Sequence, residues 1–279
     1  MGQVHAVSWT LPFGAVDFAI SANSDRGRVR KVNEDSFVAE PPLFAVADGM
    51  GGHAFGDRAS QITAAVLRTG TAGQTPTSTQ RVLAAVTAAN IAVREISADD
   101  FAGTTLTGVA LVESDDRAAY YWMVFNIGDS RVYTWIDEVL TQVSVDHSAV
   151  QELVDAGIIL PDAAATHPER NVVTRAIGLA GDPEPDIWLL PAGGQQTFVL
   201  CSDGLTKELD NAAIARELSL GGDIADRLVA AALAAGGSDN VTVVVVKATV
   251  RADTVAGASD RSIPAHLEET LPRVEEKRA

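Results

Sequence analysis

The sequence has one cysteine, few positive charges and no long apolar run. Cys201, the single cysteine, stands inside an apolar segment, so a disulfide within the chain is excluded and a small buried core residue is expected there. Lysine and arginine number 21 against 37 aspartates and glutamates, which gives a formal net charge of −16. This balance argues against binding to nucleic acids or anionic membranes, because both require basic surfaces.

Signals for export or membrane insertion are also missing. No apolar stretch approaches the roughly 20 residues that a membrane-spanning helix needs. The segment Met1-Gly2-Gln3-Val4-His5 lacks the basic start and the apolar stretch of a signal peptide. We therefore expect no membrane span and a cytoplasmic location. Without a heptad pattern or an apolar docking stretch, we expect a monomer.

Hydrophobic residues make up 47% of the 279 positions, which is enough for a large core. Apolar patterning predicts strands over 14–22, 35–47, 106–112, 119–126, 130–136, 186–190, 197–201 and 241–246. It predicts helices over 57–69, 80–97, 211–218 and 223–235, and a further helix that begins after Ser148 and stops at Gly157. Strands in two sets with helices in adjacent pairs favour a layered α+β sandwich over a Rossmann-type sheet.

Three of the apolar, strand-like segments lead into an aspartate: Asp48, Asp129 and Asp203. A carboxylate at the end of a buried strand is unfavourable unless a cation neutralises it. Hard divalent cations prefer such oxygen ligands, so the pattern predicts a metal-dependent enzyme. Two alternatives stay open at this point. An Asp-Gly pair alone usually marks a turn, and Asp129 could be structural, paired with Arg131.

Polar motifs follow one another along most of the chain. They are Asn33-Glu34-Asp35, Asp48-Gly49-Met50-Gly51-Gly52-His53, Gly103-Thr104-Thr105, Gly128-Asp129-Ser130-Arg131, Asp146-His147-Ser148, His167-Pro168-Glu169-Arg170-Asn171, Thr174-Arg175, Ser202-Asp203-Gly204-Leu205-Thr206 and Ser238-Asp239-Asn240-Val241-Thr242. Together they resemble the bacterial branch of the PP2C-like (PPM) metal-dependent protein serine/threonine phosphatases. The resemblance extends from about residue 16 to residue 248.

The resemblance implies a four-layer αββα sandwich: two antiparallel sheets flanked by helices, with a metal site at one end. It implies hydrolysis of phosphoserine and phosphothreonine by direct attack of a metal-bridging hydroxide. Phosphorylated proteins would be the partners, such as bacterial Ser/Thr kinases and their substrates. We assign the phosphatase domain to residues 1–248. Residues 249–279 carry scattered charges and few large apolar side chains, and we expect them to form a flexible tail.

The same resemblance implies the ligands of the metal ions, which would be Mn²⁺ or Mg²⁺. Asp48 would bridge two ions, and the Gly49 carbonyl would bind one of them. Asp203 and Asp239 would complete this pair of catalytic ions. Asp129, together with Asp203, resembles the acids that hold a third, weaker ion in bacterial members.

Three further residues would act on substrate or water. Arg30 matches the arginine that binds the substrate phosphate, and its planar fork suits a phosphate better than a lysine would. With Asp48 and Asp203 it would be a catalytic residue. Glu34 and Asp35 would act through metal-bound waters.

The chain departs from the family pattern at two positions near the site. Met50 stands where some members have a histidine proposed as general acid, so the proton donor stays open. His53 could replace it, although a role in helix entry or packing is the alternative. Lys207 stands where an acidic or small residue is common, and we expect it to tune the surface near the site without abolishing activity.

Residues 147–178, which we call the flap segment, are mixed in pattern, and the stretch 160–171 within them is irregular and polar, the profile of a surface flap. His147 and His167 are expected to be structural or to face the substrate, while Asn171 and Arg175 are expected to organise the segment. Two other function classes remain: a catalytically silent relative that acts as a binding module, and a small-molecule phosphatase. Retention of Asp48, Asp203 and Asp239 favours the active protein phosphatase.

Overall fold

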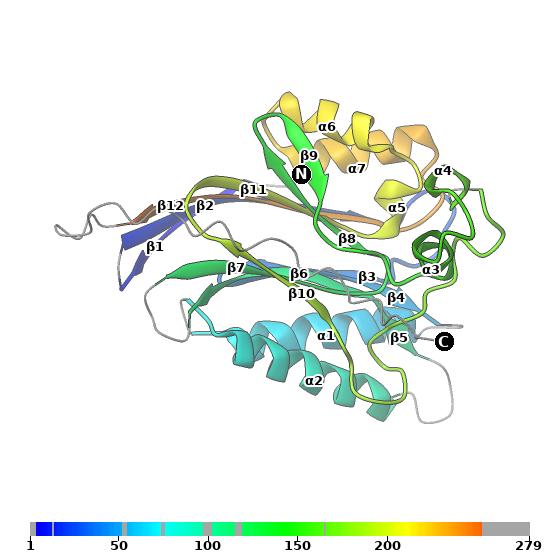
Figure 1. The fold of residues 1–279 in the computed structure, drawn as a ribbon, viewed down its shortest axis with the longest axis horizontal. Coiled ribbons are helices and arrows are strands. Elements are labelled where there is room, and N and C mark those ends of the chain that lie inside the picture. The colour runs from blue at the N-terminus through cyan, green and yellow to red at the C-terminus, as the bar shows by residue number, and fades with distance from the viewer. Residues whose placement is uncertain are drawn as a thin grey trace, which may run out of the picture.

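The structure is a computed structural model that describes residues 4–12, 14–51, 55–73, 76–96, 102–114, 119–164 and 166–252. These residues form two antiparallel sheets that pack face to face, with helices on both outer surfaces (Figure 1). This four-layer arrangement confirms the expected αββα sandwich. None of the helices in the described part of the chain combines the length and the apolar character that crossing a bilayer requires.

The first sheet contains strands from both the beginning and the end of the described chain. Its strand order is β1 (His5–Leu11), β2 (Gly14–Asp25), β12 (Val241–Ala252), β11 (Gly194–Cys201), β8 (Arg131–Ile136) and β9 (Val139–Gln142). Each strand is antiparallel to its neighbours. The long pairing of β12 with β2 therefore brings residues near 241 next to residues near 25, at the end of the sheet where the predicted site residues stand.

The second sheet comes from the middle of the chain. Its strand order is β10 (Asp186–Pro191), β7 (Tyr120–Ile127), β6 (Leu106–Glu113), β4 (Leu43–Met50) and β3 (Asp35–Glu40). These strands are also antiparallel, and the short β5 (Gly103–Thr104) pairs with the last residues of β4. Asp48 thus lies between two neighbouring strands at the end of a sheet.

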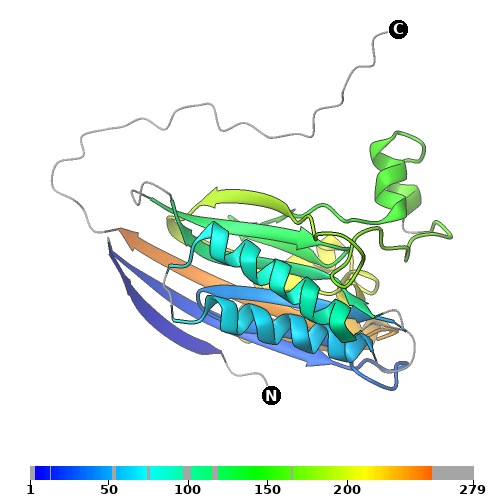
Figure 2. The same ribbon diagram turned by 90° about the horizontal axis from the view of Figure 1, so that it is seen from below.

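Helices cover the outer faces of both sheets. The second sheet is covered by α1 (Gly56–Thr71) and α2 (Thr79–Ile96). The first is covered by α5 (Asp203–Thr206), α6 (Asn211–Ser219) and α7 (Ile224–Ala235). The flap segment carries α3 (Ala149–Asp155) and α4 (Pro161–Ala164), and it projects from the body of the protein in Figure 2. Ser148 caps α3 as predicted, since its hydroxyl accepts a hydrogen bond from the Gln151 N–H.

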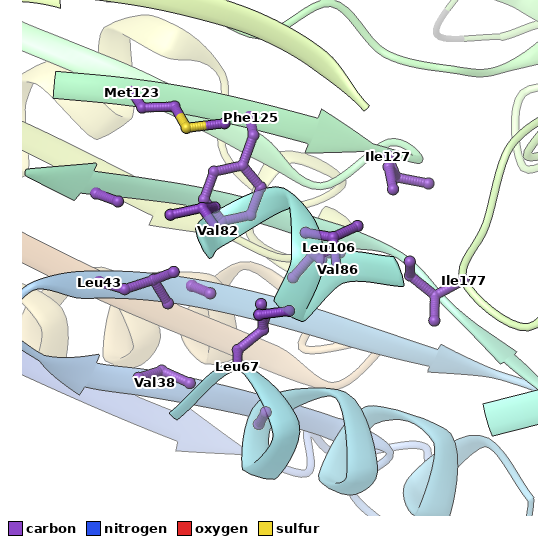
Figure 3. Close-up of a cluster of buried hydrophobic side chains, with 14 of the residues drawn as sticks. Val38, Leu43, Leu67, Val82, Val86, Leu106, Met123, Phe125, Ile127 and Ile177 are labelled. Atoms are coloured by element: carbon purple, nitrogen blue, oxygen red, sulfur yellow. The ribbon is translucent and has the colours of Figure 1, made fainter. Parts of the chain in front are cut away.

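Buried side chains fill three layers between these elements. One layer lies between the second sheet and the two long helices, where Figure 3 shows side chains of both helices gathered with those of β4, β6 and β7. Another lies between the first sheet and α5 to α7. Between the sheets, the Trp122 ring stands 6.1 Å from that of Phe18 and 5.2 Å from that of Phe198, so aromatic contacts join the two sheets.

The apolar run at the start of β12 follows from this layering. Val244 and Val246 face the other sheet, whereas Val243 and Val245 face the helices. A strand that is buried on both faces needs apolar side chains at every position instead of at alternate ones. The sequence pattern at 241–246 is therefore the pattern of a central strand, as predicted.

The structure differs from the sequence-based expectations at several boundaries. The segment 35–47 forms a hairpin and not one strand, because Pro41 and Pro42 lack the N–H groups that a continuous ladder would use. The edge strands β1 and β9 were not predicted. The strand β12 continues to Ala252 by pairing with β2, so the expected boundary at 248 falls inside it. Residues 253–279, the expected tail, lie outside the described residues.

The aromatic contact between the sheets gives a prediction for stability. Phe198 is fully buried, so Phe198→Ala should lower the free energy of unfolding by about 3–5 kcal/mol through lost burial and a cavity. Ile158→Ala is the control, because this side chain is 68% exposed and its loss should cost less than about 0.5 kcal/mol. Urea unfolding measures the loss of unfolding free energy in both variants, provided that the m-value stays unchanged. Equal costs for the two variants would contradict a tightly packed layer between the sheets.

Candidate active site and metal centre

The predicted site residues come together at one end of the sandwich. A cleft of about 1140 Å³ opens there, beside the flap segment. Of the eight residues assigned from the sequence, seven line it: Arg30, Glu34, Asp48, Gly49, Asp129, Asp203 and Asp239. Asp35 is buried behind them. The elements that contribute to the cleft, β4, α5 and the flap helices, lie at the right-hand end of Figure 1.

Two of the carboxylates face each other across neighbouring strands. Asp35 at the start of β3 is the direct cross-strand partner of Asp48 on β4. Like charges at such positions repel, and burial increases the cost. Burial and the nearby Asp35 and Asp203 carboxylates raise the pKa of Asp48 well above its usual range. Burial also raises the pKa of Asp35 to about 7.

The backbone around Asp48 is held rigidly. The Asp48 N–H donates to Thr105 Oγ1 at 3.0 Å. Its carbonyl oxygen accepts from the Thr105 N–H at 2.9 Å and from Thr104 Oγ1 at 2.9 Å. A Cβ on Gly49 would lie 2.1 Å from the Gly56 carbonyl oxygen, so only glycine fits after Asp48. The strand end therefore presents the Asp48 carboxylate in a fixed position.

Asp35 and Asp203 each have a buried oxygen to which no described residue donates a hydrogen bond. The hydroxyl of Ser202 donates to Asp35 Oδ2 at 2.8 Å, but Asp35 Oδ1 has no hydrogen-bond partner within the described part of the chain. Asp203 begins α5 directly after β11, and its Oδ1 is likewise buried and unpaired. Unpaired buried carboxylate oxygens are costly. Both oxygens thus provide acceptor capacity for a cation.

Asp239 lies in the loop between α7 and β12 and is held by two cationic side chains. Arg30 Nε lies 2.8 Å from Asp239 Oδ1, and an Arg30 Nη donates to Oδ2 at 3.0 Å. Lys207 Nζ lies 2.8 Å from Asp239 Oδ2 and 2.5 Å from Asp203 Oδ2. Burial alone would raise the pKa of Asp239, but Lys207 and Arg30 together lower it.

Asp129 follows the tight turn at Gly128, between β7 and β8. Burial and the Asp203 carboxylate raise its pKa to about 7. The alternative partner Arg131 does not pair with it. Arg131 binds Asp146 with two nitrogens, at 2.9 Å for Nε to Oδ1 and 2.6 Å for Nη2 to Oδ2. Asp129 therefore faces the cleft without the ion pair that a purely structural role would use.

Asn240 holds the loop that carries Arg30 and Glu34, and the sequence reasoning assigned it no role. Its Nδ2 donates to the carbonyl oxygens of Arg26 and Val32, and its Oδ1 accepts from the Glu34 N–H. Asn240 directly follows Asp239, so the same turn positions the Asp239 carboxylate and the loop that carries Arg30 and Glu34. Burial raises the pKa of Glu34 above its usual value.

The histidines of the flap segment do not line the cleft. His147 is buried, its Nδ1 accepts from the Gly128 N–H at 3.2 Å, and its Nε2 lies 3.1 Å from Asp186 Oδ2. Burial lowers the pKa of His147, which fits a structural role next to the Asp129 turn. His167 accepts a hydrogen bond within its own turn. Arg175 binds Asp186 and so joins the segment to β10. His53 lies outside the described residues.

The chemistry of these side chains fits a hard divalent ion. The donors are carboxylate oxygens, two of them are buried and unpaired, and the acids repel one another. Among the described residues, however, no group of three His, Cys, Asp or Glu side chains converges to form a complete cage. Mg²⁺ does not require one, since it is usually held by one or two carboxylates and keeps several waters.

Comparison with known proteins supports the relationship that the motifs indicate. The sequence pattern of the Protein phosphatase 2C family matches residues 26–234. The serine/threonine protein phosphatase PstP of Mycobacterium tuberculosis is 40% identical over 232 residues, which are 81% of this chain and 44% of PstP. This chain thus spans less than half the length of that relative. The serine/threonine phosphatase stp of Listeria innocua is 34% identical over 80% of this chain and 93% of its own length.

Solved structures show the same fold. The PPM Ser-Thr phosphatase MsPP from Mycobacterium smegmatis, in complex with cacodylate, superimposes with a TM-score of 0.74 at 37% identity, covering 82% of this chain and 97% of MsPP. The catalytic domain of PstP in complex with two manganese ions gives a TM-score of 0.73 at 36% identity, covering 84% of this chain and 99% of that domain. The chain belongs to the protein phosphatase 2C family.

Proposed function

We propose that the chain is a metal-dependent protein serine/threonine phosphatase that hydrolyses phosphoserine and phosphothreonine. The observation that carries this proposal is the single cleft in which Asp48, Asp129, Asp203 and Asp239 meet Arg30. Anionic side chains around an open cleft suit a divalent ion, and an arginine beside them suits the phosphate of a substrate. The relatives named as serine/threonine phosphatases support the same activity.

Asp48, Asp203 and Asp239 are the side chains that would hold two ions, with the Gly49 carbonyl as a further ligand. When bound, such divalent ions would supply a hydroxide nucleophile near neutral pH and would neutralise charge on the phosphate. We propose Mn²⁺ or Mg²⁺ for this role, and the PstP domain solved with two manganese ions supports Mn²⁺. Glu34 lines the cleft beside these ligands, Asp35 is buried behind them, and both would orient water.

Arg30 would bind the substrate phosphate. Its side chain is 50% exposed and lines the cleft, so a phosphate oxygen can reach the guanidinium from solvent. The guanidinium already pairs with Asp239, and this contact orients its planar fork. Arg30 then stabilises negative charge on phosphate oxygens as the ester bond breaks.

The size and walls of the cleft favour a phosphorylated protein over a small phosphomonoester. About 1140 Å³ exceeds the range of roughly 300–1,000 Å³ that small-molecule pockets occupy. One wall is formed by the flap segment, including Val150, Val154 and Arg170, which offers both apolar and cationic contacts to a polypeptide. Bacterial Ser/Thr kinases and their substrates are the partners that we propose, for a monomer acting in the cytoplasm.

The metal requirement can be tested with an aryl phosphate and a phosphothreonine peptide. Hydrolysis should require Mn²⁺, and Asp203→Asn should lower kcat by at least about 100-fold, since several kcal/mol of charge stabilisation is lost. Asp182→Asn removes an exposed aspartate outside the cleft and should leave the rate unchanged. Turnover in excess chelator, or a fully active Asp203→Asn variant, would rule out this mechanism. An inactive wild type that still binds Mn²⁺ would support the silent binding module.

A second prediction concerns the third ion. Asp129 points into the cleft without an ion pair to Arg131, so Asp129→Ala should lower turnover by about tenfold, which is about 1.4 kcal/mol of barrier. Two Mn²⁺ ions per chain should remain, as counted by titration calorimetry. Unchanged turnover would make Asp129 structural, and loss of all bound Mn²⁺ would place it among the ligands of the two catalytic ions.

A third prediction concerns pH and the protein without metal. The folded state raises the pKa values of Asp35 and Asp129 to about 7, against roughly 4 in an unfolded chain. The folded state therefore holds protons that the unfolded state releases, and stability falls as pH rises from about 4 to about 7. Melting temperatures in chelator should decrease over this range. Asp129→Asn should flatten the decrease, and a flat wild-type profile would contradict the buried, uncompensated acids.

A further inference from the structure

Lys207 occupies a position that the family resemblance did not anticipate. Its ammonium group lies 2.5 Å from Asp203 Oδ2 and 2.8 Å from Asp239 Oδ2, and so joins two of the proposed metal ligands. The side chain is 31% exposed and lines the cleft. This residue is therefore a positive charge inside the proposed metal centre and not on the surface beside it.

The local fold places Lys207 there. It directly follows α5, and its N–H donates to the Asp203 carbonyl oxygen at 2.8 Å. Asp203 and Lys207 are four residues apart, with the acid first, which is the favourable order for an ion pair along a helix. Gly204 also fixes this turn, because a Cβ at its position would lie 1.9 Å from the Asn240 carbonyl oxygen.

Lys207 completes the set of partners of Asp239. Oδ1 accepts from Arg30 Nε at 2.8 Å and from the Asn240 N–H at 2.9 Å. Oδ2 accepts from an Arg30 Nη at 3.0 Å and from Lys207 Nζ at 2.8 Å. A carboxylate offers about four acceptor positions, so those of Asp239 are all in use. A metal ion cannot bind Asp239 unless one of these donors leaves.

Lys207 is the donor that can leave at the smallest cost. The Asn240 N–H belongs to the backbone, and Arg30 contacts Asp239 through two nitrogens. The lysine side chain is flexible, opens onto the cleft and keeps a strongly hydrated charge when it moves into water. Its departure would free oxygens on both Asp203 and Asp239 at once.

We propose that Lys207 is a tethered counter-ion that holds Asp203 and Asp239 together when no metal is bound and that a divalent ion must displace. This inference rests on the proposed metal site. The lysine offsets the repulsion among the acids of the metal-free protein. It also competes with the ion for the same two carboxylates, so the chain binds divalent ions more weakly than its aspartates alone would allow.

The test compares Lys207→Gln with wild type and with Lys31→Gln. Glutamine keeps most of the side-chain length but removes the charge. Lys31 is an exposed lysine that neighbours Arg30, and it makes no ion pair with the residues that the structure describes, so its replacement controls for the loss of one positive charge near the cleft. Circular dichroism checks that each variant is folded.

Titration calorimetry with Mn²⁺ is the main measurement. Lys207→Gln should bind Mn²⁺ at least about tenfold more tightly, because a positive charge within contact distance of the ligands is gone. In chelator, the same variant should melt about 2–4 °C below wild type, because its ion pairs with Asp203 and Asp239 are lost. The Mn²⁺-induced rise in melting temperature should therefore be larger in Lys207→Gln. Lys31→Gln should match wild type in all three.

Unchanged Mn²⁺ affinity in Lys207→Gln would overturn the inference, and so would an equal gain in Lys31→Gln, which would reduce the effect to net charge. Weaker Mn²⁺ binding in Lys207→Gln would also overturn it, because the lysine would then support the metal-bound state. Failure of the proposed function would give a different result. Wild type and both variants would then show either no Mn²⁺ binding or binding that persists in Asp239→Asn.

Discussion

The repulsion among buried carboxylates at one end of the sandwich is the constraint on which the rest of the site depends. Asp35 and Asp48 are cross-strand neighbours, while Asp129 approaches them from the turn between β7 and β8 and Asp203 from the start of α5. The hydrophobic effect does not favour bringing these carboxylates together, because each of them loses its hydration on burial. The two sheets, packed through Phe18, Trp122 and Phe198, must therefore hold the acids in place at the cost of stability.

Antiparallel topology explains how residues far apart in the sequence reach one cleft. The pairing of β12 with β2 places Asp239 and Asn240 beside the loop that carries Arg30 and Glu34. The pairing of β4 with β3 and β5 brings Asp48 to the same end. Close backbone contacts at Gly49 and Gly204 leave no room for a Cβ at either position. The backbone positions of Asp48 and Asp203, which precede these glycines, are thus fixed by close packing.

Sequence reasoning succeeded where local pattern and burial coincide. The run Val241–Val246 has the other sheet on one face and helices on the other, so its apolar character alone identified it. The strand β9 has an exposed, mixed pattern and pairs with the edge strand β8, a partner that no local signal reports. Pro41 and Pro42 did carry a usable signal, since proline cannot continue a ladder, and the hairpin there was predictable from them.

Motif order grouped the acids correctly, but it could not predict how their charges are balanced. From the sequence, Lys207 was expected to affect only the surface near the site. Its short distance to Asp239 depends on how closely α5 approaches the start of β12, and the sequence does not report this approach. Lys207 contacts both Asp203 and Asp239, and Arg30 pairs with Asp239, so two cationic side chains already balance part of the negative charge in the cleft. A cleft of the proposed kind, which would accept divalent cations and a phosphate, needs the repulsion among its acids offset while it is empty. As the proposed counter-ion, the Lys207 ammonium group offsets this repulsion and can still leave, because the side chain is flexible and its charge stays strongly hydrated in water.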